Sequence, residues 1–138
     1  MPESILRGHC LCKAVQYVVS EEPLWCAHCH CGDCRRHTGS AVATFVGVDK
    51  DGLKLTAGEF GRIESSAGVY RSFCSRCGTP MAYETDELPG EIHLYLGTLE
   101  RPDEISPTLE VFCRERLPWL QLAVDGPSFE GLPVQEPS

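Results

Sequence analysis

Eight of the nine cysteines in this chain fall into three short clusters, and their spacing constrains the fold more than any other feature. The clusters are Cys10 and Cys12; Cys26, Cys29, Cys31 and Cys34; and Cys74 and Cys77. Cysteines so close together on a tight turn can direct two sulfur atoms at one point. A tetrahedral zinc ion needs this arrangement, whereas a disulfide between near neighbours rarely tolerates it. The sequence therefore predicts a zinc-binding protein.

Length and composition favour one soluble domain. The chain has 138 residues and is 42% hydrophobic, enough for a single core, so we expect one domain over residues 1–138. No run approaches the roughly eighteen apolar residues of a membrane span, and residues 1–11 lack an export pattern. We therefore expect a cytoplasmic protein with no membrane partner. In that reducing setting, an odd number of cysteines favours metal ligands over disulfides.

The charge of the chain argues against nucleic acid as a partner. The formal net charge is −8, and zinc-bound thiolates would add negative charge. The one dense cationic patch, Arg35, Arg36 and His37, is short. A phosphate backbone would be repelled by such a surface.

The residue pattern predicts mainly short strands and little helix, in irregular sheets held together by metal. The expected strands cover residues 5–11, 14–20, 25–29, 41–48, 53–56, 62–65, 69–74, 81–85 and 91–99. The first two flank the Cys10–Cys12 turn as a hairpin. Residues 32–36 can form one helical turn that Gly39 ends, and Gly78 suits a positive φ behind the last cysteine pair.

The C-terminal part of the chain is interrupted by proline. Five prolines after Arg101-Pro102 limit any long helix there. We expect Trp119 and Phe129 to anchor this tail to the rest of the protein.

The spacing suggests how the cysteines divide between two zinc ions. Cys10 and Cys12 supply two of four ligands, and Cys74 and Cys77 are the natural complement, which predicts a structural site that cross-links distant parts of the chain. Cys29, Cys31 and Cys34 remain on a compact bend. Three protein ligands and an open position are typical of a catalytic zinc.

Other assignments stay open at this point. Cys26, His28, His30 or His37 could fill the fourth position and make the second site structural as well. Cys26 and Cys113 could equally be buried small apolar residues, and His9 and His93 ordinary surface or strand residues. Arg35 and Arg36 are either solvated charges or groups that attract an anion to the thiolate site.

An open site with three thiolates indicates a particular chemistry. Three sulfur donors weaken zinc as a Lewis acid, so the site suits activation of a bound thiol better than polarisation of water. The activated thiolate could attack a small electrophile. We therefore expect an enzyme that makes or breaks a carbon–sulfur bond.

Several motifs resemble those of the glutathione-dependent formaldehyde-activating enzyme family. Residues 8–17 resemble its G-x-C-x-C-x-x-V-x-Y opening. Residues 29–36, followed by Gly39 and Ser40, resemble its C-H-C-x-x-C-R-R segment, and residues 71–79 resemble its R-x-F-C-x-x-C-G-T element. Residues 96–99 (LGTL) and Trp119 also fall where the family has them. The likeness runs from about residue 8 to residue 129.

The resemblance implies a fold, two zinc sites and an activity. The implied fold consists of several short coiled antiparallel β-sheets, as in a zinc-containing chaperone of Rab GTPases. The structural zinc would bind Cys10, Cys12, Cys74 and Cys77, and the second zinc Cys29, Cys31 and Cys34. The implied reaction condenses glutathione with formaldehyde to S-hydroxymethylglutathione, which makes the protein a carbon–sulfur lyase with a thiol and a small aldehyde as partners.

The chain also departs from the family pattern. Glu110 stands where many relatives carry the histidine of a Pro-x-x-His segment, and Cys26 is additional. Two other functions remain as alternatives: a non-catalytic zinc module that binds a protein, and a thiol-based metal or redox buffer. The sequence gives no indication of the oligomeric state.

Overall fold

The computed structural model describes residues 5–132, which are folded mainly as β-strands. The strands are β1 (Leu6–His9), β2 (Gln16–Val19), β3 (Trp25–Cys29), β4 (Ala43–Asp49), β5 (Leu53–Ala57), β6 (Gly61–Ser66), β7 (Val69–Phe73), β8 (Pro80–Thr85), β9 (Glu91–Tyr95) and β10 (Leu109–Val111). The described residues also form one α-helix, α1 (Gly32–Thr38), and the 3-10 turns η1 (Lys50–Gly52), η2 (Leu96–Thr98), η3 (Pro102–Glu104) and η4 (Cys113–Glu115). The predicted mainly β fold is confirmed.

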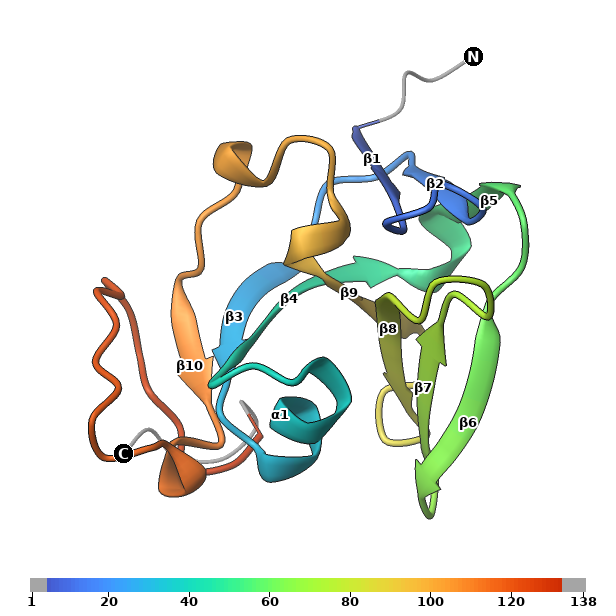
Figure 1. The fold of residues 1–138 in the computed structure, drawn as a ribbon. Helices are drawn as coiled ribbons and strands as arrows, with labels where there is room; N and C mark the ends of the chain where they lie inside the picture. The colour runs from blue at the N-terminus through green and yellow to red at the C-terminus, as the bar shows by residue number, and fades with distance from the viewer. Residues whose placement is uncertain (1–4, 133–138) are drawn as a thin grey trace.

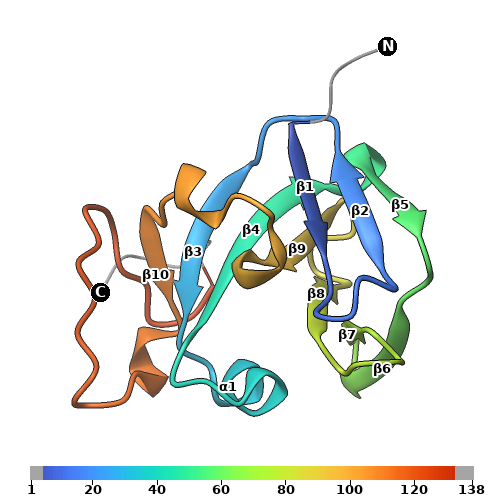
Figure 2. The same cartoon turned by 45° about the horizontal axis from the view of Figure 1, so that its top comes forward.

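The strands form two sheets that lie on different sides of the molecule (Figures 1 and 2). The smaller sheet has the order β1-β2-β5, and the larger has the order β10-β3-β4-β9-β8-β7-β6. All of these pairings are antiparallel except that of β10 with β3. The β1–β2 hairpin predicted around the first cysteine pair is present, with Gly8 opposite Tyr17.

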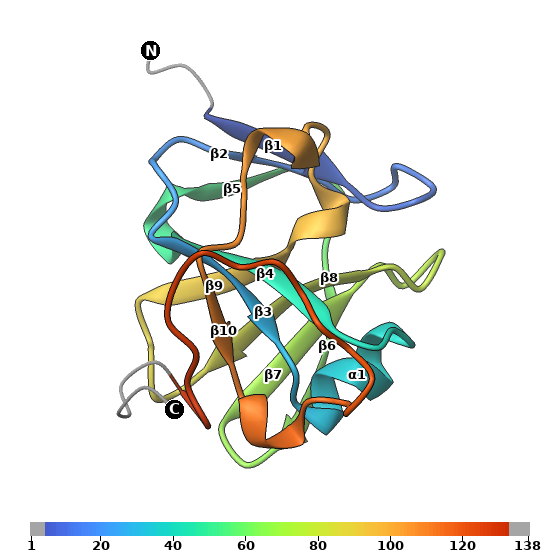
Figure 3. The same cartoon turned by 90° about the vertical axis from the view of Figure 1, so that its left-hand side faces the viewer.

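The larger sheet is strongly curved, so that its outer strands β10 and β6 lie on opposite sides of α1 (Figure 1). Helix α1 follows β3 directly and sits at the end of β3 and β4 (Figure 3). The concave face of the sheet therefore looks toward the first residues of this helix. The helix ends at Gly39, as predicted, with a φ of 70° that suits glycine.

Strand β4 is buried on both faces and separates two apolar cores. Val46 and Val48 belong to the core that also contains Val19 and Cys26, while Phe45 belongs to a second core with Cys29 and Phe129. Successive residues of a strand point to opposite faces, so a strand covered on both sides carries a nearly continuous apolar run. This is why residues 41–48 were recognisable as a buried strand.

The C-terminal part differs most from expectation. After β9 the chain turns into η2 rather than continuing extended to residue 99, and β10 adds a parallel strand that the sequence pattern did not reveal. Phe129 anchors the tail as predicted, being 9% exposed. Trp119 does not, because its side chain is 70% exposed. Within residues 5–132, no helix is long and apolar enough to cross a membrane.

Candidate metal centre and its adjoining cavity

The first and last cysteine pairs meet in space and form a four-sulfur cluster. The sulfur atoms of Cys10, Cys12, Cys74 and Cys77 all lie within 4.8 Å of one another. The Cys10–Cys12 and Cys12–Cys74 sulfur distances are 3.7 and 3.9 Å. Zinc–sulfur bonds of about 2.3 Å give a tetrahedron with edges of about 3.8 Å. The spacing therefore fits a single tetrahedral metal ion.

The turns that carry these cysteines also place amide donors at the sulfur atoms. Val15 N–H donates to the Cys10 sulfur at 3.3 Å, and Arg76 and Cys77 N–H both donate to the Cys74 sulfur at 3.4 Å. Gly78 has a φ of 80°, as predicted, which lets the chain fold back behind the last pair. Such donors stabilise thiolates and fix the orientation of metal ligands.

Thr79 connects the two halves of this cluster. Its hydroxyl accepts a hydrogen bond from Leu11 N–H at 3.0 Å and lies 3.1 Å from the Cys77 sulfur. The contact with the Thr79 hydroxyl lowers the pKa of Cys77 to about 5. Because Leu11 belongs to the β1–β2 turn and Thr79 to the β7–β8 turn, the cluster joins the small sheet to the large one.

The second cluster lies where β3 runs into α1. The sulfur atoms of Cys29, Cys31 and Cys34 lie within 4.8 Å of one another, and those of Cys29 and Cys34 are 3.6 Å apart. Cys31 caps the helix, since its sulfur accepts a hydrogen bond from Cys34 N–H at 3.2 Å. These distances also fit the edge of a zinc tetrahedron, about 3.8 Å.

The three sulfur atoms share their protons unequally. Hydrogen bonds with Cys29 and Cys34 lower the pKa of Cys31, and the nearby charge of Arg71 acts in the same direction. The hydrogen bond to Cys31 raises the pKa of Cys29, as does burial. Of these two thiols, Cys31 is therefore the one that its surroundings favour as a thiolate.

A buried arginine that the cysteine spacing does not reveal faces this cluster. Arg71 on β7 is 3% exposed. Its guanidinium donates to the Cys34 sulfur and to the Tyr95 hydroxyl, each at 3.4 Å, and to the Ser65 hydroxyl at 3.1 Å. A buried guanidinium needs an anionic partner, and the thiolate trio supplies one. The available signal was the place of Arg71 as the first residue of the R-x-F-C-x-x-C-G-T element at residues 71–79.

The residues considered as a fourth ligand point elsewhere. Cys26 faces the other core, His28 bonds to Thr44, and His37 bonds to the Tyr95 hydroxyl. His30 Nε2 lies 2.9 Å from Glu110. Within residues 5–132, the cluster of close ligand atoms contains the three sulfurs and no fourth side chain.

Glu110 forms a separate buried group with His30 and Cys113. The ligand atoms of these three residues lie within 4.8 Å of one another, so they too could hold a metal ion. The Glu110 carboxylate is also 3.8 Å from the Arg116 guanidinium. Cys113 is buried, as expected, and burial raises the pKa of its thiol. Through its contact with His30, Glu110 ties β10 to the bend after β3.

Arg35 is a structural residue. Its guanidinium donates to the backbone carbonyls of His30 and Glu115, the latter at 2.7 Å. Arg36 is exposed. The two arginines of the motif thus differ, and one of them fixes the bend that carries Cys31.

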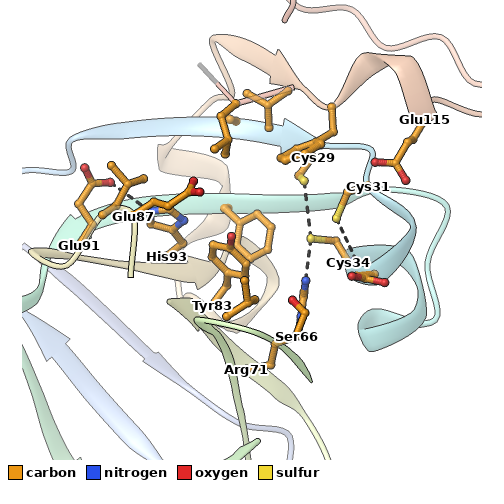
Figure 4. A pocket seen from close by; sticks show the side chains of 18 of the residues that line it. Cys29, Cys31, Cys34, Ser66, Arg71, Tyr83, Glu87, Glu91, His93 and Glu115 are labelled. Atoms are coloured by element: carbon orange, nitrogen blue, oxygen red, sulfur yellow. Dashed lines mark hydrogen bonds and ion pairs between the residues drawn. The ribbon is translucent and has the colours of Figure 1, made fainter. Parts of the chain in front are cut away.

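A cavity of about 510 Å³ opens beside the second cluster, on the concave face of the large sheet. Figure 4 shows the three cysteines at one end, Glu87, Glu91 and His93 at the other, and Tyr83 between them. The strands β3, β4, β7, β8, β9 and β10 all contribute to its walls. A cavity of this size is typical of small-molecule sites.

Aromatic rings line the middle of this cavity. Trp25 and His93 pack edge to face at 4.4 Å between ring centroids, Tyr83 stacks on His93 at 5.3 Å, and Phe45 lies 5.8 Å from Tyr83. The Trp25 indole has room here because Gly47, which lies opposite it on β4, has no side chain. A Cβ at Gly47 would come within 2.2 Å of the indole.

Comparisons with known proteins give a family and a shared fold. The family model described as glutathione-dependent formaldehyde-activating enzyme matches residues 5–115. A crystal structure of a Rhodobacter sphaeroides protein, a structural genomics target, is 24% identical with a TM-score of 0.59, covering 73% of this chain and 91% of that one. This likeness shows that the two proteins share a fold. The search of curated proteins found no match.

Proposed function

Because the chain belongs to the glutathione-dependent formaldehyde-activating enzyme family, we propose that it is a zinc-dependent carbon–sulfur lyase acting on a thiol adduct of a small aldehyde. Glutathione and formaldehyde are the thiol and aldehyde that the family name gives. The observation that carries the proposal is the trio of Cys29, Cys31 and Cys34, which opens onto a cavity large enough for a substrate.

In this proposal Cys29, Cys31 and Cys34 would hold a zinc ion, and the adjoining cavity would bind the substrate. When bound, zinc would supply the positive charge that stabilises a thiolate near neutral pH. Condensation forms the carbon–sulfur bond, with the thiol losing its proton and the carbonyl oxygen gaining one. The reverse reaction breaks that bond and leaves its electron pair on sulfur.

The residues around the trio support this chemistry. Arg71 places a fixed positive charge against the Cys34 sulfur, which offsets the excess negative charge of three thiolates. Phe45 and Tyr83 line the cavity next to the sulfurs with aromatic rings, and walls of low polarity strengthen electrostatic interactions there. Both effects favour a reactive thiolate over a solvated one.

The other cluster has a structural role in this proposal. Cys10, Cys12, Cys74 and Cys77 would hold a second zinc that joins the two sheets. Metal binding to such a set contributes directly to folding. The cavity beside the three-cysteine cluster favours an enzyme over a binding module or a metal buffer, because neither alternative requires a cavity there.

Two cysteine variants test the proposal. The zinc-loaded protein should contain two zinc ions, and should accelerate exchange between glutathione, formaldehyde and their adduct, measured by NMR above the uncatalysed rate. Cys31→Ser should lose this acceleration and one zinc while keeping its circular dichroism spectrum. Cys74→Ser should unfold the protein, and Cys113→Ala, as a control, should keep both ions. Full activity of Cys31→Ser would disprove the catalytic role of the trio.

A further inference from the structure

The cavity beside the three-cysteine cluster is much larger than the formaldehyde part of a thiol adduct needs. Formaldehyde contributes one carbon and one oxygen to its thiol adduct, whereas the cavity measures about 510 Å³. Cavities of roughly 300–1,000 Å³ enclose whole organic ligands of drug size. The extra space therefore takes a further part of the substrate.

The walls of the cavity suit an aromatic group. Ring contacts connect Trp25, Phe45, Tyr83 and His93, with centroids 4.4–6.3 Å apart in edge-to-face, tilted and stacked arrangements. Phe45 and His93 are buried, at 3% and 6% exposure. A flat apolar ring placed among them would gain both burial of apolar surface and favourable ring contacts.

The charges around the cavity disfavour an anion. Asp33, Glu87, Glu91 and Glu115 line it, while Arg71 is the one lysine or arginine among the lining residues in the described part of the chain. That guanidinium is already bonded to Cys34, Tyr95 and Ser65. Glu91 accepts a hydrogen bond from the Trp25 indole at 3.0 Å, so its carboxylate is fixed at the far end of the cavity.

Glutathione does not match these walls. At neutral pH it carries two carboxylates and one ammonium group, a net charge of about −1. Its two carboxylates would face one guanidinium, that of Arg71, whose Nε and Nη1 already donate to Ser65, Cys34 and Tyr95. A carboxylate that reached the far end would meet Glu87 and Glu91 (Figure 4). Burying an unpaired carboxylate is costly, so a peptide of this kind would be held outside the aromatic part.

We propose that the cavity binds an uncharged aromatic group of the substrate, carried by either the aldehyde or the thiol half of the carbon–sulfur adduct. This inference rests on the proposed lyase function and names its substrate class. For an aromatic aldehyde, the adduct is a hemithioacetal. Its cleavage breaks the carbon–sulfur bond, leaves the electron pair on sulfur, and forms the aldehyde as the hydroxyl oxygen loses its proton. No oxidant or reductant is needed.

The test compares three substrate pairs on the zinc-loaded protein. The pairs are formaldehyde with glutathione, benzaldehyde with glutathione, and formaldehyde with benzyl mercaptan, each followed by NMR exchange above the uncatalysed rate. We expect kcat/KM for at least one aromatic pair to exceed that of formaldehyde with glutathione by about tenfold or more. The faster of the two aromatic pairs identifies which half carries the ring.

Binding is measured separately from catalysis. Trp25 and Trp119 are the two tryptophans of the chain, and Trp119 is exposed, so Trp119→Phe leaves Trp25 as a reporter inside the cavity. Benzyl mercaptan should quench this fluorescence with saturation, and glutathione should not at equal concentration. Glu87→Lys, at an exposed lining position, should shift the preference toward glutathione.

The outcomes separate the two proposals. If formaldehyde with glutathione is the fastest pair and benzyl mercaptan leaves the Trp25 fluorescence unchanged, the aromatic assignment is wrong and the lyase function stands. If benzyl mercaptan binds but no pair is accelerated, the lyase function is wrong and the cavity assignment stands.

Discussion

The Arg71 guanidinium donates a hydrogen bond to the sulfur of Cys34, 3.4 Å away, in the buried space between β7 and α1. This contact places a permanent positive charge next to a group of three sulfurs that would otherwise repel one another as thiolates. The strand that carries Arg71 also connects the two proposed metal sites, because β7 leads directly into the Cys74–Cys77 turn.

Replacing Arg71 by Met should weaken metal binding at the three-cysteine cluster. Loss of an outer-shell partner typically lowers metal affinity by about 10–100-fold. We expect a competing chelator to remove the zinc of the three-cysteine cluster from Arg71→Met at a lower concentration than from the wild type. The zinc of the four-cysteine cluster should be retained. Arg62→Met, on the exposed neighbouring strand β6, is the matched control and should bind zinc like the wild type. Equal affinities in all three proteins would contradict the role of Arg71.

Thr79→Val should destabilise the four-cysteine site selectively. The substitution keeps the shape of the side chain but removes the hydroxyl that contacts both the Cys77 sulfur and Leu11 N–H. We expect about tenfold or greater loss of affinity for the structural metal, in line with other outer-shell changes. Thr79→Ser restores the hydroxyl and should restore binding. A cobalt-substituted sample, whose absorption reports sulfur ligation, distinguishes this site from the other.

Glu110→Ala should lower the stability of the whole fold. It would leave the Nε2 of buried His30 without its partner 2.9 Å away, and leaving a buried polar group unsatisfied costs about 1–3 kcal/mol. Urea unfolding of the zinc-loaded protein measures the change. Glu130→Ala, at an exposed position nearby in the tail, should be close to neutral. A similarly small effect for Glu110→Ala would show that the pair contributes little.

Stability should fall as the pH drops below about 6.5, partly because of His93. Burial lowers the pKa of His93 in the folded protein, against the opposing influence of Glu91. Below pH 6.5, the approximate pKa of histidine in the unfolded chain, the unfolded chain therefore binds more protons than the folded protein. The contribution of neutral His93 to the unfolding free energy is complete above that pH and is lost on acidification. The difference in unfolding free energy between pH 7.5 and pH 5.5 should be smaller in His93→Gln than in the wild type. An unchanged difference would exclude His93 as a contributor.

The cysteine clusters were predictable because their geometry is local. One or two residues between cysteines on a turn determine where two sulfurs can point, and the pairing of Cys10 and Cys12 with Cys74 and Cys77 then followed from the number of ligands. Strand β4 was predictable for a similar reason, since its apolar run shows that both faces are covered.

Features that depend on distant parts of the chain were not predictable. Arg71 is buried only because the curved sheet brings β7 against α1, and nothing in its immediate sequence shows this contact. The parallel pairing of β10 with β3 joins residues about eighty positions apart, with no repeat to signal it. Trp119 and Phe129 look equivalent as large aromatic residues of the tail. Phe129 is buried because the backbone of residues 127–131 pairs with β10 and the turn after it, while Trp119 lies in a segment without such pairing.

The absence of a side chain at Gly47 has a consequence for how the protein could acquire new substrates. Gly47 does not line the cavity, yet an added methyl group there would push the Trp25 indole and so change the width of the chamber from outside. Selectivity could therefore be altered by one mutation that leaves every sulfur and every wall residue in place. Among natural variants of this fold, the residue facing that indole is the place to look for divergence in ligand preference.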